Sequence, residues 1–435
     1  MGVIRHILFI SVFLIFWNSS AQKIRDTVSF DGEFYIEHIV SAGESIKSIA
    51  KIHKIKISDL LENNEIDTRL YYNQLLYIPF KKNKTVTKNK LIPSITSSNS
   101  DVVNIALLMP YYLIKNDTMF NQYEDELDES KIYYNQSESA LSFHIGIELA
   151  IDSLRRAGKN IVLHTFDTNK DTLVVKKLVY SNHLDKMDII IGPMYSRFFR
   201  ILCKRYGNVK NKILISPLSR NNKGLERYSS VYQVAPSYKV QANILVNYLI
   251  KNQLNDNIII LHDQKTKSLS ADVIRKFRKV RKKVDAFEII HTETDSIRSF
   301  FSPKQHVLLL SSNKAFLSKM LASMGSIDST SIVYTFESIK SYENLDITNL
   351  MELNVHIPNS SFMNYSSQFD ISFLNLYERE FHTNVRKYTK TGYNLVMQFC
   401  GQTRVYDFKR KKRGYHENLL APIYHYYDYE LVPVN

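Results

Sequence analysis

The side chains best suited to catalysis do not form the spacings that hydrolytic chemistry requires. The sequence has no Gly-x-Ser-x-Gly nucleophile turn, no His-Glu-x-x-His zinc motif and no Cys/His arrangement of the protease type. Its 13 histidines are scattered. Three of them, on or beside expected strands and helices, are better explained as core or edge residues: His144, His164 and His291. We therefore expect a chain that is not an enzyme and has no cofactor or metal site.

Three serines have a placement that suits anion binding instead. Ser196 and Ser219 lie just beyond the ends of expected strands, where exposed backbone N–H groups and the helix dipole favour a negative charge. Ser216 closes one of these strands, directly before Pro217. The position of all three depends on the strands and helices around them.

Strands and helices alternate from residue 102 to residue 336. This alternation predicts an α/β fold with parallel sheets and right-handed crossovers. Because about 335 residues exceed what one core holds, we expect two lobes. The expected strands are 102–109, 161–166, 188–191, 212–215, 257–261, 284–291, 305–310 and 332–336, and the expected helices are 139–156, 172–184, 196–206, 237–251, 270–282 and 314–324.

An acidic, tyrosine-rich segment, Met119 to Gln136, interrupts the alternation after the first expected strand. Loops at the carboxyl ends of parallel strands are where sites form. A mobile surface insertion is the favoured explanation of this composition, and its carboxylate pairs are what any acidic loop offers. Both interpretations stay open.

A shorter module precedes this body. Short strand-like runs at Ile36 and at Tyr77–Ile78 enclose two helical stretches, in the order β-α-α-β. Ser45 can cap the first of these helices by accepting its free N–H groups. The apolar face of that helix has helical spacing and consists of Ile46, Ile49 and Ala50.

This module, residues 34–80, resembles the LysM family. Gly43-Glu44-Ser45-Ile46 stands where the family has Gly-Asp/Glu-Thr-Leu, Leu60 and Asn64 match its Leu-x-x-x-Asn, and Gln74 to Pro79 match its closing motif. Asn73 replaces the usual glycine, and Asn tolerates a left-handed backbone. The resemblance implies binding of the N-acetylglucosamine-containing glycan of peptidoglycan or chitin, with candidate glycan-binding residues Gly43, Glu44, Ser45, Ile46 and Asn64.

The body, residues 101–435, resembles the type I periplasmic-binding-protein fold, in the branch of the leucine and branched-chain amino-acid receptors. The resemblance implies two lobes, with the chain passing between them near residues 236, 360 and 402. It is carried by the runs 105–110 and 146–152, the turns 189–193 and 215–219, and Thr391 to Asn394.

The same resemblance implies a ligand between the lobes, whose carboxylate meets helix N-termini and hydroxyls. Ser196, Ser216 and Ser219 are the candidates for that role. Glu337, after the strand 332–336, is either the acidic partner of an amine or a solvated loop carboxylate. The loop 263–268 lacks the aromatic residue that family members often have, so the cleft could serve protein contact instead.

Residues 1–21 are predicted to be a secretory signal peptide. Arg5 and His6 give a basic start, the apolar run from Ile7 to Trp17 is too short to span a bilayer, and the small residues Ser19 to Ala21 follow it. No other stretch approaches the ~20 apolar residues of a spanning helix. There is no cysteine near the predicted cleavage site, so we do not expect a bacterial lipid anchor. We expect a periplasmic or cell-envelope location.

The chain carries a formal charge of +14. Export argues against nucleic acid as the partner, whereas peptidoglycan and outer-membrane surfaces are anionic and attract a basic protein at long range. The basic residues form local clusters at 81–90, 275–283 and 409–413. The first cluster belongs to a polar segment, residues 81–100, that is predicted to be a flexible linker.

Two further features concern packing. Cys203 and Cys400 both lie in apolar helical contexts, which favours free buried thiols over a disulfide. The run from Tyr424 to Val432 alternates with a period of two, which predicts one strand with an aromatic face. We expect that face to serve packing rather than glycan binding.

Together these observations predict a non-enzymatic envelope protein that binds peptidoglycan through LysM. Its body would sense a ligand or contact and regulate wall-synthesis proteins, by analogy with a peptidoglycan-synthase activator that has a similar body. The alternative is a wall-retained solute-binding protein for an amino acid or peptide.

Overall fold

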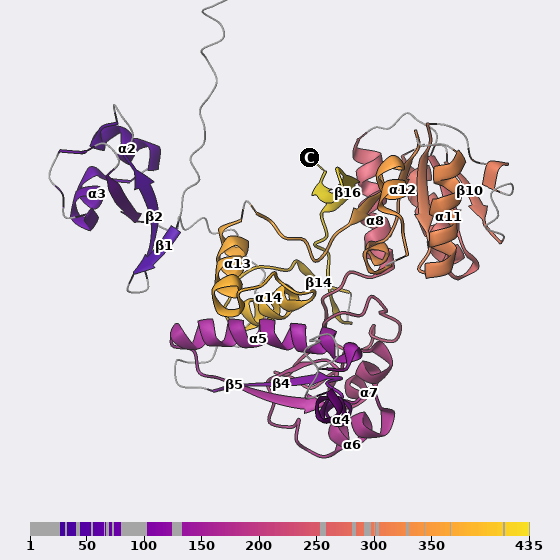
Figure 1. Cartoon of the computed structure of the whole chain (residues 1–435), viewed down its shortest axis with the longest axis horizontal. Coiled ribbons are helices and arrows are strands. Elements are labelled where there is room, and N and C mark those ends of the chain that lie inside the picture. Colours follow the sequence, from indigo (N-terminus) through magenta and orange to yellow (C-terminus); the bar gives the residue numbers. More distant parts are fainter. Residues whose placement is uncertain are drawn as a thin grey trace, which may run out of the picture. The chain divides into compact units, whose positions relative to one another are not determined.

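The computed structural model shows a small N-terminal module and a larger two-lobed body (Figure 1). Both the predicted signal peptide and the linker 81–100 lie outside the described residues, as do residues 124–132 of the acidic segment. The described residues are 27–30, 33–40, 44–53, 55–64, 66, 69–71, 74–79, 102–123, 133–252, 258–280, 284–290, 297–299, 301, 304–327, 330–342, 344–365, 367–411 and 414–434.

The chain divides into two units, which are described separately. The first comprises residues 1–90 with 364–372, and the second comprises 91–363 with 373–435. The N-terminal module contains the predicted β-α-α-β order, preceded by a strand that the sequence did not predict. Its elements are β1 (Thr27–Phe30), β2 (Glu33–Ile39), α2 (Ile46–His53), α3 (Ile57–Asn64) and β3 (Leu75–Pro79), with the strands antiparallel in the order β1-β2-β3.

Helix α2 begins at a reciprocal pair of serines. The Ser48 N–H donates to Ser45 Oγ at 3.2 Å, and the Ser45 N–H donates to Ser48 Oγ at 2.8 Å, so each hydroxyl satisfies one backbone group of the first turn. This fixes the face of α2 that is buried. The small core of the module consists of Val40, Ile46, Ile49, Ala50, Leu60, Leu76 and Ile78.

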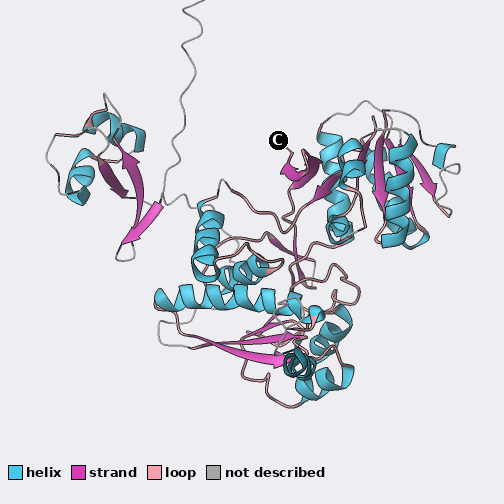
Figure 2. Cartoon of the chain, viewed as in Figure 1, coloured by secondary structure: helices cyan, strands magenta, loops and turns pink. Residues whose placement is uncertain are grey.

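The first lobe of the body is built on a sheet in the order β14-β15-β8-β7-β6-β4-β5, in which only β14 runs antiparallel to its neighbour. Figure 2 shows helices flanking the strands. The elements are β4 (Val103–Met109), α4 (Leu113–Tyr123), α5 (Glu138–Arg156), β5 (Ile161–Asp167), α6 (Thr172–Tyr180), β6 (Ile189–Ile191), α7 (Ser196–Tyr206), β7 (Ile213–Ser216), β8 (Val231–Gln233), α14 (Thr389–Phe399), β14 (Phe408–Arg410) and β15 (His416–Asn418).

The second lobe is built on a sheet in the order β10-β9-β11-β12-β13-β16-β17. The strands from β10 to β13 are parallel, and β16 and β17 pair in antiparallel fashion. The elements are α8 (Tyr238–Lys251), β9 (Ile258–His262), α9 (Lys267–Lys279), β10 (Val284–Glu288), β11 (His306–Leu310), α11 (Lys314–Ile327), β12 (Ile332–Tyr334), α12 (Ile347–Glu352), β13 (His356–Pro358), β16 (Ile423–Tyr427) and β17 (Glu430–Pro433). Helix α13 (Gln368–Phe381) follows β13. The predicted α/β class with largely parallel sheets is confirmed.

The chain passes from one sheet to the other three times. It does so between β8 and α8, between β13 and α14, and between β15 and β16 at residues 419–422. The prediction of a third crossing near residue 402 is therefore corrected. The reason is that the three-residue strands β14 and β15 extend the first sheet before the chain leaves it.

The C-terminal aromatic run forms a hairpin and not the single strand that its alternation predicted. Asp428 and Tyr429 both have positive φ angles, 47° and 63°, which is the conformation of a two-residue hairpin turn. Tyr424 is buried, while Tyr427 and Tyr429 are exposed. The two cysteines are free, which confirms the prediction, and burial raises the pKa of Cys400 to about 12.

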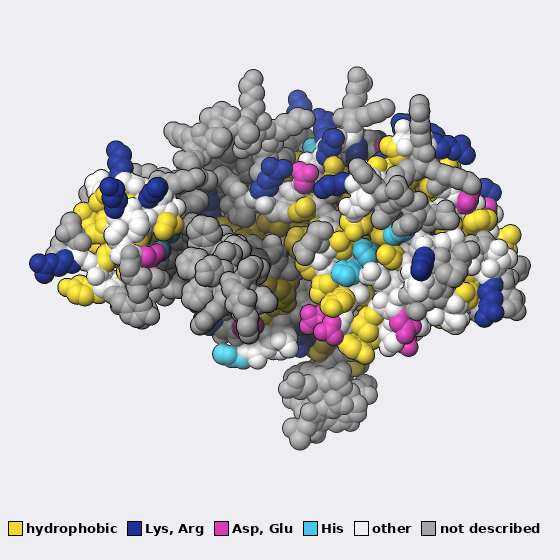
Figure 3. All heavy atoms as spheres, turned by 90° about the horizontal axis from the view of Figure 1, so that it is seen from above, with side chains coloured by type: hydrophobic (Ala, Val, Ile, Leu, Met, Phe, Trp, Pro, Cys, Tyr) yellow, Lys and Arg dark blue, Asp and Glu magenta, His cyan; other side chains and the backbone are white. Residues whose placement is uncertain are grey.

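On the face that Figure 3 shows, Lys and Arg side chains occur in several separate groups on both units. This agrees with the local clusters of the sequence. Lys412 and Arg413, at the end of the 409–413 cluster, lie outside the described residues.

Helices α5 and α14 contact each other through two glycines. A Cβ atom on Gly146 would lie 1.8 Å from the Thr389 carbonyl oxygen, and one on Gly392 would lie 2.2 Å from the Phe143 carbonyl oxygen. Because Cβ contacts under 3.0 Å essentially never occur, neither position has room for a side chain. The glycine of the Thr391–Asn394 motif is thus a packing residue that lets the two backbones meet.

The substitution Gly392→Ala should lower the free energy of unfolding by about 2 kcal/mol, because the added methyl group overpacks this contact. Denaturant unfolding of the full chain measures the loss. The control is Gly325→Ala on α11, where the nearest atom to the added Cβ is the movable Asn349 Oδ1 at 3.0 Å. A similar effect of both substitutions would contradict the packing role of Gly392.

Candidate functional site

The three predicted serines lie at one edge of the first sheet. Strands β6 and β7 are parallel, with Ile191 opposite Ile215, so their carboxyl ends coincide. Ser196 is the first residue of α7, which follows β6. Ser216 is the buried last residue of β7, and Ser219 lies in the loop after it. The edge that the sequence predicted is therefore formed.

The turn between β6 and α7 requires glycine at residue 192. Gly192 has a φ of +87°, and a Cβ there would lie 2.3 Å from the Leu108 carbonyl oxygen. Only glycine combines this backbone conformation with so close an approach. The Gly192-Pro193 turn thereby directs the chain from the sheet into α7 and sets the position of Ser196.

A carboxylate that sequence reasoning missed already occupies one helix start at this edge. Asp167, the last residue of β5, accepts hydrogen bonds from the N–H groups of Tyr111, Tyr112 and Leu113 at 2.9, 3.3 and 2.9 Å. These groups precede and open α4. Asp167 therefore supplies the negative charge that a helix N-terminus favours, from within the chain.

Aromatic residues border the same edge. The Tyr112 and Tyr134 rings meet edge to face with centroids 5.1 Å apart, and Lys115 Nζ lies 4.7 Å from the Tyr134 centroid. Burial, followed by the neighbouring Tyr195 and Tyr134, raises the pKa of Tyr112 to about 12. Tyr134 belongs to the tyrosine-rich segment 119–136, whereas Tyr112 and Tyr195 had no sequence signal beyond the abundance of tyrosine.

Glu337 lies on the second lobe, where it follows β12 after Thr335 and Phe336 and is the first residue of a 3-10 helix (Glu337–Ser341). Its side chain is only 2% exposed, which excludes the alternative of a solvated loop carboxylate. Ser360 donates to this carboxylate from its N–H at 3.0 Å and from its hydroxyl at 2.6 Å. The Ser361 hydroxyl donates at 3.2 Å.

Two cations complete the surroundings of this carboxylate. Arg220 Nη2, from the loop after β7 in the first lobe, lies 3.2 Å from Glu337 Oε2. Lys340 Nζ lies 3.7 Å from Oε1. Burial by itself would raise the pKa of Glu337, but Arg220, Lys340 and the Ser360 hydroxyl outweigh it and hold that pKa below its ordinary value of 4.5.

The Arg220–Glu337 pair brings one part of the predicted serine cluster together with the predicted acid. Arg220 directly follows Ser219, whose carbonyl oxygen accepts a hydrogen bond from the Gln233 side chain at 3.0 Å. Gln233 is fully buried, so this bond anchors the loop from which Arg220 extends. The acid that was one candidate partner of a ligand amine therefore meets a guanidinium of its own chain.

The predicted glycan-binding residues of the N-terminal module also have partners in the structure. Glu44 Oε2 lies 2.9 Å from His38 Nε2, Ser45 caps α2, and Ile46 belongs to the core. The Asn64 side chain joins α3 to β3, since it accepts from the Tyr77 N–H at 2.5 Å and donates to the Tyr77 carbonyl oxygen at 2.7 Å. Gly43 lies outside the described residues.

Among the side chains of this module that the structure describes, the most exposed aromatic is a residue without a sequence prediction. Tyr71, in the segment before β3, has 68% of its surface exposed, although its N–H donates to Gln74 Oε1 at 2.9 Å. Its backbone is thus held in a turn while its ring faces solvent. A flat exposed ring on a held backbone suits contact with a sugar.

The substitution Glu337→Gln should lower the free energy of unfolding by about 3 kcal/mol at pH 7, because it leaves Arg220 without its buried partner. The pKa of Glu337 is depressed in the folded chain, so its stabilisation is complete above the ordinary carboxylate range. It disappears as the pH falls through the folded-state pKa.

Denaturant unfolding of both chains from pH 7 downward measures this difference. The control is Glu352→Gln on α12, an exposed carboxylate, for which little change is expected at any pH. If the deficit of Glu337→Gln persisted unchanged at acid pH, the ion pair would not be its cause.

Among the described residues, no helix is both long and apolar enough to cross a membrane. In the same part of the chain, no three His, Cys, Asp or Glu side chains are grouped to hold a metal ion. No protein in the curated collection of sequences matches this one.

Solved structures with the same fold as the body are transporter-related proteins and a full-length LpoA. A putative branched-chain amino acid ABC transporter from Rhodospirillum rubrum is 10% identical, with a TM-score of 0.56, and the match covers 77% of this chain and 100% of that one. An ABC transporter substrate-binding protein from Desulfitobacterium hafniense, in complex with Leu, is 14% identical, with a TM-score of 0.51 and coverage of 77% and 100%.

Full-length LpoA from Haemophilus influenzae is 10% identical, with a TM-score of 0.50, and the match covers 78% of this chain but only 60% of LpoA. Two family models match the sequence. The LysM domain matches residues 38–79, and the receptor family ligand binding region matches residues 144–400, more than half of the chain. The chain therefore belongs to the receptor family ligand binding region, with a type I periplasmic-binding-protein-like body, and carries a LysM domain before it.

Proposed function

We propose that this chain is a non-enzymatic protein of the cell envelope that is held on peptidoglycan glycan by its LysM domain, while its body contacts and regulates proteins of wall synthesis. The fold alone does not decide this. It is shared by a substrate-binding protein in complex with Leu and by LpoA, whose C-domain carries the description of a regulator of PBP1A. The choice has to come from the residues of the cleft.

The observation that carries the proposal is the ion pair between Arg220 and Glu337. A receptor that captures an amino acid needs an acidic group available for the ammonium of its ligand. Here the acid after β12 is buried, accepts three hydrogen bonds and pairs with a guanidinium from the opposite lobe. A ligand amine would have to displace Arg220, at a cost of several kcal/mol for the separated charge.

The edge of the first sheet where a ligand carboxylate would bind gives partial support to the contact role. Asp167 already occupies the helix start at α4, so that end of the sheet edge is negative rather than open to a carboxylate. Ser196 and Ser219 remain the proposed positions for an anionic group. A body whose own side chains pair the charged groups between its lobes is suited to presenting a fixed outer surface to another protein.

Solute capture is the second candidate, because Ser196, Ser216, Ser219 and Glu337 stand at the strand ends where ligands of such bodies bind. A thermal-shift screen of leucine, other amino acids, short peptides and muropeptides on the full chain separates the two candidates. We expect no shift with amino acids, because Arg220 holds the amine position.

A ligand at a hundredfold excess over its dissociation constant would stabilise the chain by about 2.7 kcal/mol, which is readily detected. Stabilisation of the unaltered chain by leucine would overturn the contact role in favour of capture. The matched variant is Arg220→Ala. A thermal shift with leucine that appears in this variant and not in the unaltered chain would show that Arg220 blocks the site.

Wall binding should depend on the LysM domain and on its exposed ring. In co-sedimentation with purified sacculi, the full chain should pellet and a chain that lacks residues 34–80 should stay soluble. The substitution Tyr71→Ala should weaken binding roughly tenfold, or about 1.4 kcal/mol, through loss of the ring. The control is Tyr180→Ala, an exposed tyrosine on α6 of the body. Equal pelleting without residues 34–80 would refute glycan binding by this domain.

A further inference from the structure

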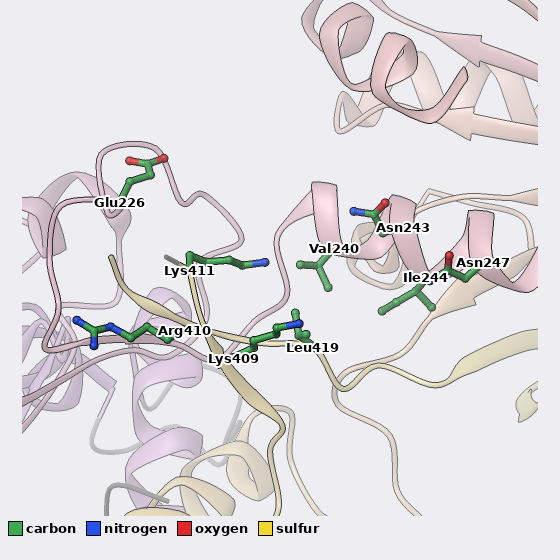
Figure 4. A pocket seen from close by; sticks show the side chains of 9 residues that line it. All are labelled: Glu226, Val240, Asn243, Ile244, Asn247, Lys409, Arg410, Lys411 and Leu419. Carbon is green, nitrogen blue, oxygen red and sulfur yellow. The ribbon is translucent and has the colours of Figure 1, made fainter. Parts of the chain in front are cut away.

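A pocket of about 940 Å³ lies between α8 and the hairpin that begins with β14. Figure 4 shows its lining side chains. Its lining includes none of the residues that contact Glu337. Helix α8 contributes Val240, Ile244 and two asparagines from the second lobe. The first lobe contributes Glu226, Lys409, Arg410 and Lys411, and Leu419 lies on the third crossing.

The positive charges of the pocket come from Lys409 and Arg410 of β14 and from Lys411, which directly follows this strand. Side chains of a strand alternate between its two faces. Lys409 and Lys411 therefore extend toward α8, and Arg410 points the other way (Figure 4). Lys411 Nζ is held 2.9 Å from the buried Glu417 carboxylate. Lys409 is exposed and forms no ion pair within the part of the chain that the structure describes.

The wall that carries these lysines is fixed to the first lobe. A Cβ on Gly414 would lie 2.1 Å from the Glu226 carbonyl oxygen, so the hairpin and the Glu226 segment touch through their backbones. The Tyr415 hydroxyl lies 2.9 Å from Asn222 Nδ2, which donates to it. The cationic wall is thus positioned before any ligand arrives.

The chemistry of the lining selects among anionic ligands. Val240, Ile244 and Leu419 supply apolar surface that a phosphate or a polyphosphate cannot fill, and Glu226 places a negative charge on the same lining. The volume is at the upper end of the roughly 300–1,000 Å³ of small-molecule sites. An extended chain of mixed apolar and acidic groups matches these features better than a compact metabolite or a uniform polyanion.

We propose that this pocket binds an extended peptide segment of a partner protein in which acidic and apolar residues alternate. The acidic side chains pair with Lys409 and the apolar ones cover Ile244 and Leu419. Since the lining comes from both lobes, the bound segment stabilises one relative position of the lobes. The inference builds on the proposed contact role, to which it adds the chemistry of the partner segment.

Fluorescence anisotropy of labelled peptides, titrated with the full chain, tests the proposal. The probes are a short peptide of alternating Glu and Val, the matching peptide of alternating Lys and Val, polyglutamate and inorganic polyphosphate. We expect the Glu/Val peptide to bind, and Lys409→Glu to weaken it at least about tenfold. The substitution Ile244→Gln should weaken it about fivefold by removing apolar contact, which a purely electrostatic site would not show.

The matched control is Lys251→Glu, a charge reversal at the exposed end of α8, which should leave the affinity unchanged. The proposal is overturned if polyglutamate or polyphosphate binds as tightly as the Glu/Val peptide, if Lys409→Glu has no effect, or if the Glu/Val peptide does not bind. Stabilisation by leucine would remove the contact role of the cleft, yet the peptide titration would still report on this pocket separately.

Discussion

Arg220 and Glu337 come from different lobes, and the burial of one depends on the presence of the other. A carboxylate that is 2% exposed is stable as an anion only where paired charges and hydrogen bonds replace its water. Here they come from the first-lobe loop, from Lys340 and from Ser360 and Ser361 beyond β13. One group of contacts therefore ties together both lobes and the segment that connects them.

The body could be predicted largely from hydrophobic patterning, and the failures have local physical causes. Strands such as β4 and β11 are buried on both faces, so they appear in the sequence as continuous apolar runs. Strands β14 and β15 have three residues each, which is too few to give a hydrophobic pattern. For this reason the third crossing was predicted too early in the chain. The positive φ of Tyr429 has no sequence signal, because tyrosine rarely adopts it.

In the candidate site, the residues that could be predicted from the sequence are clearly separated from those that could not. Ser196, Ser216, Ser219 and Glu337 could be found because they follow strand ends, a position that topology alone identifies. Arg220 and Asp167 could not, because their partners are distant in sequence and one chain does not reveal such pairings. In the LysM domain the motif singled out Asn64, and its amide bonds to Tyr77 show a structural task that motif matching cannot distinguish from ligand contact.

The contact between α5 and α14 has a consequence for how the chain reaches its native state. Helix α14 and strands β14 and β15 belong to the first lobe, yet they follow the whole of the second lobe's parallel sheet in the chain. During synthesis from the N-terminus, the face of α5 that carries Gly146 stays uncovered until Gly392 of α14 has been made. The first lobe, although it begins first, can be completed only near the end, so the nascent body exposes apolar surface for most of its emergence.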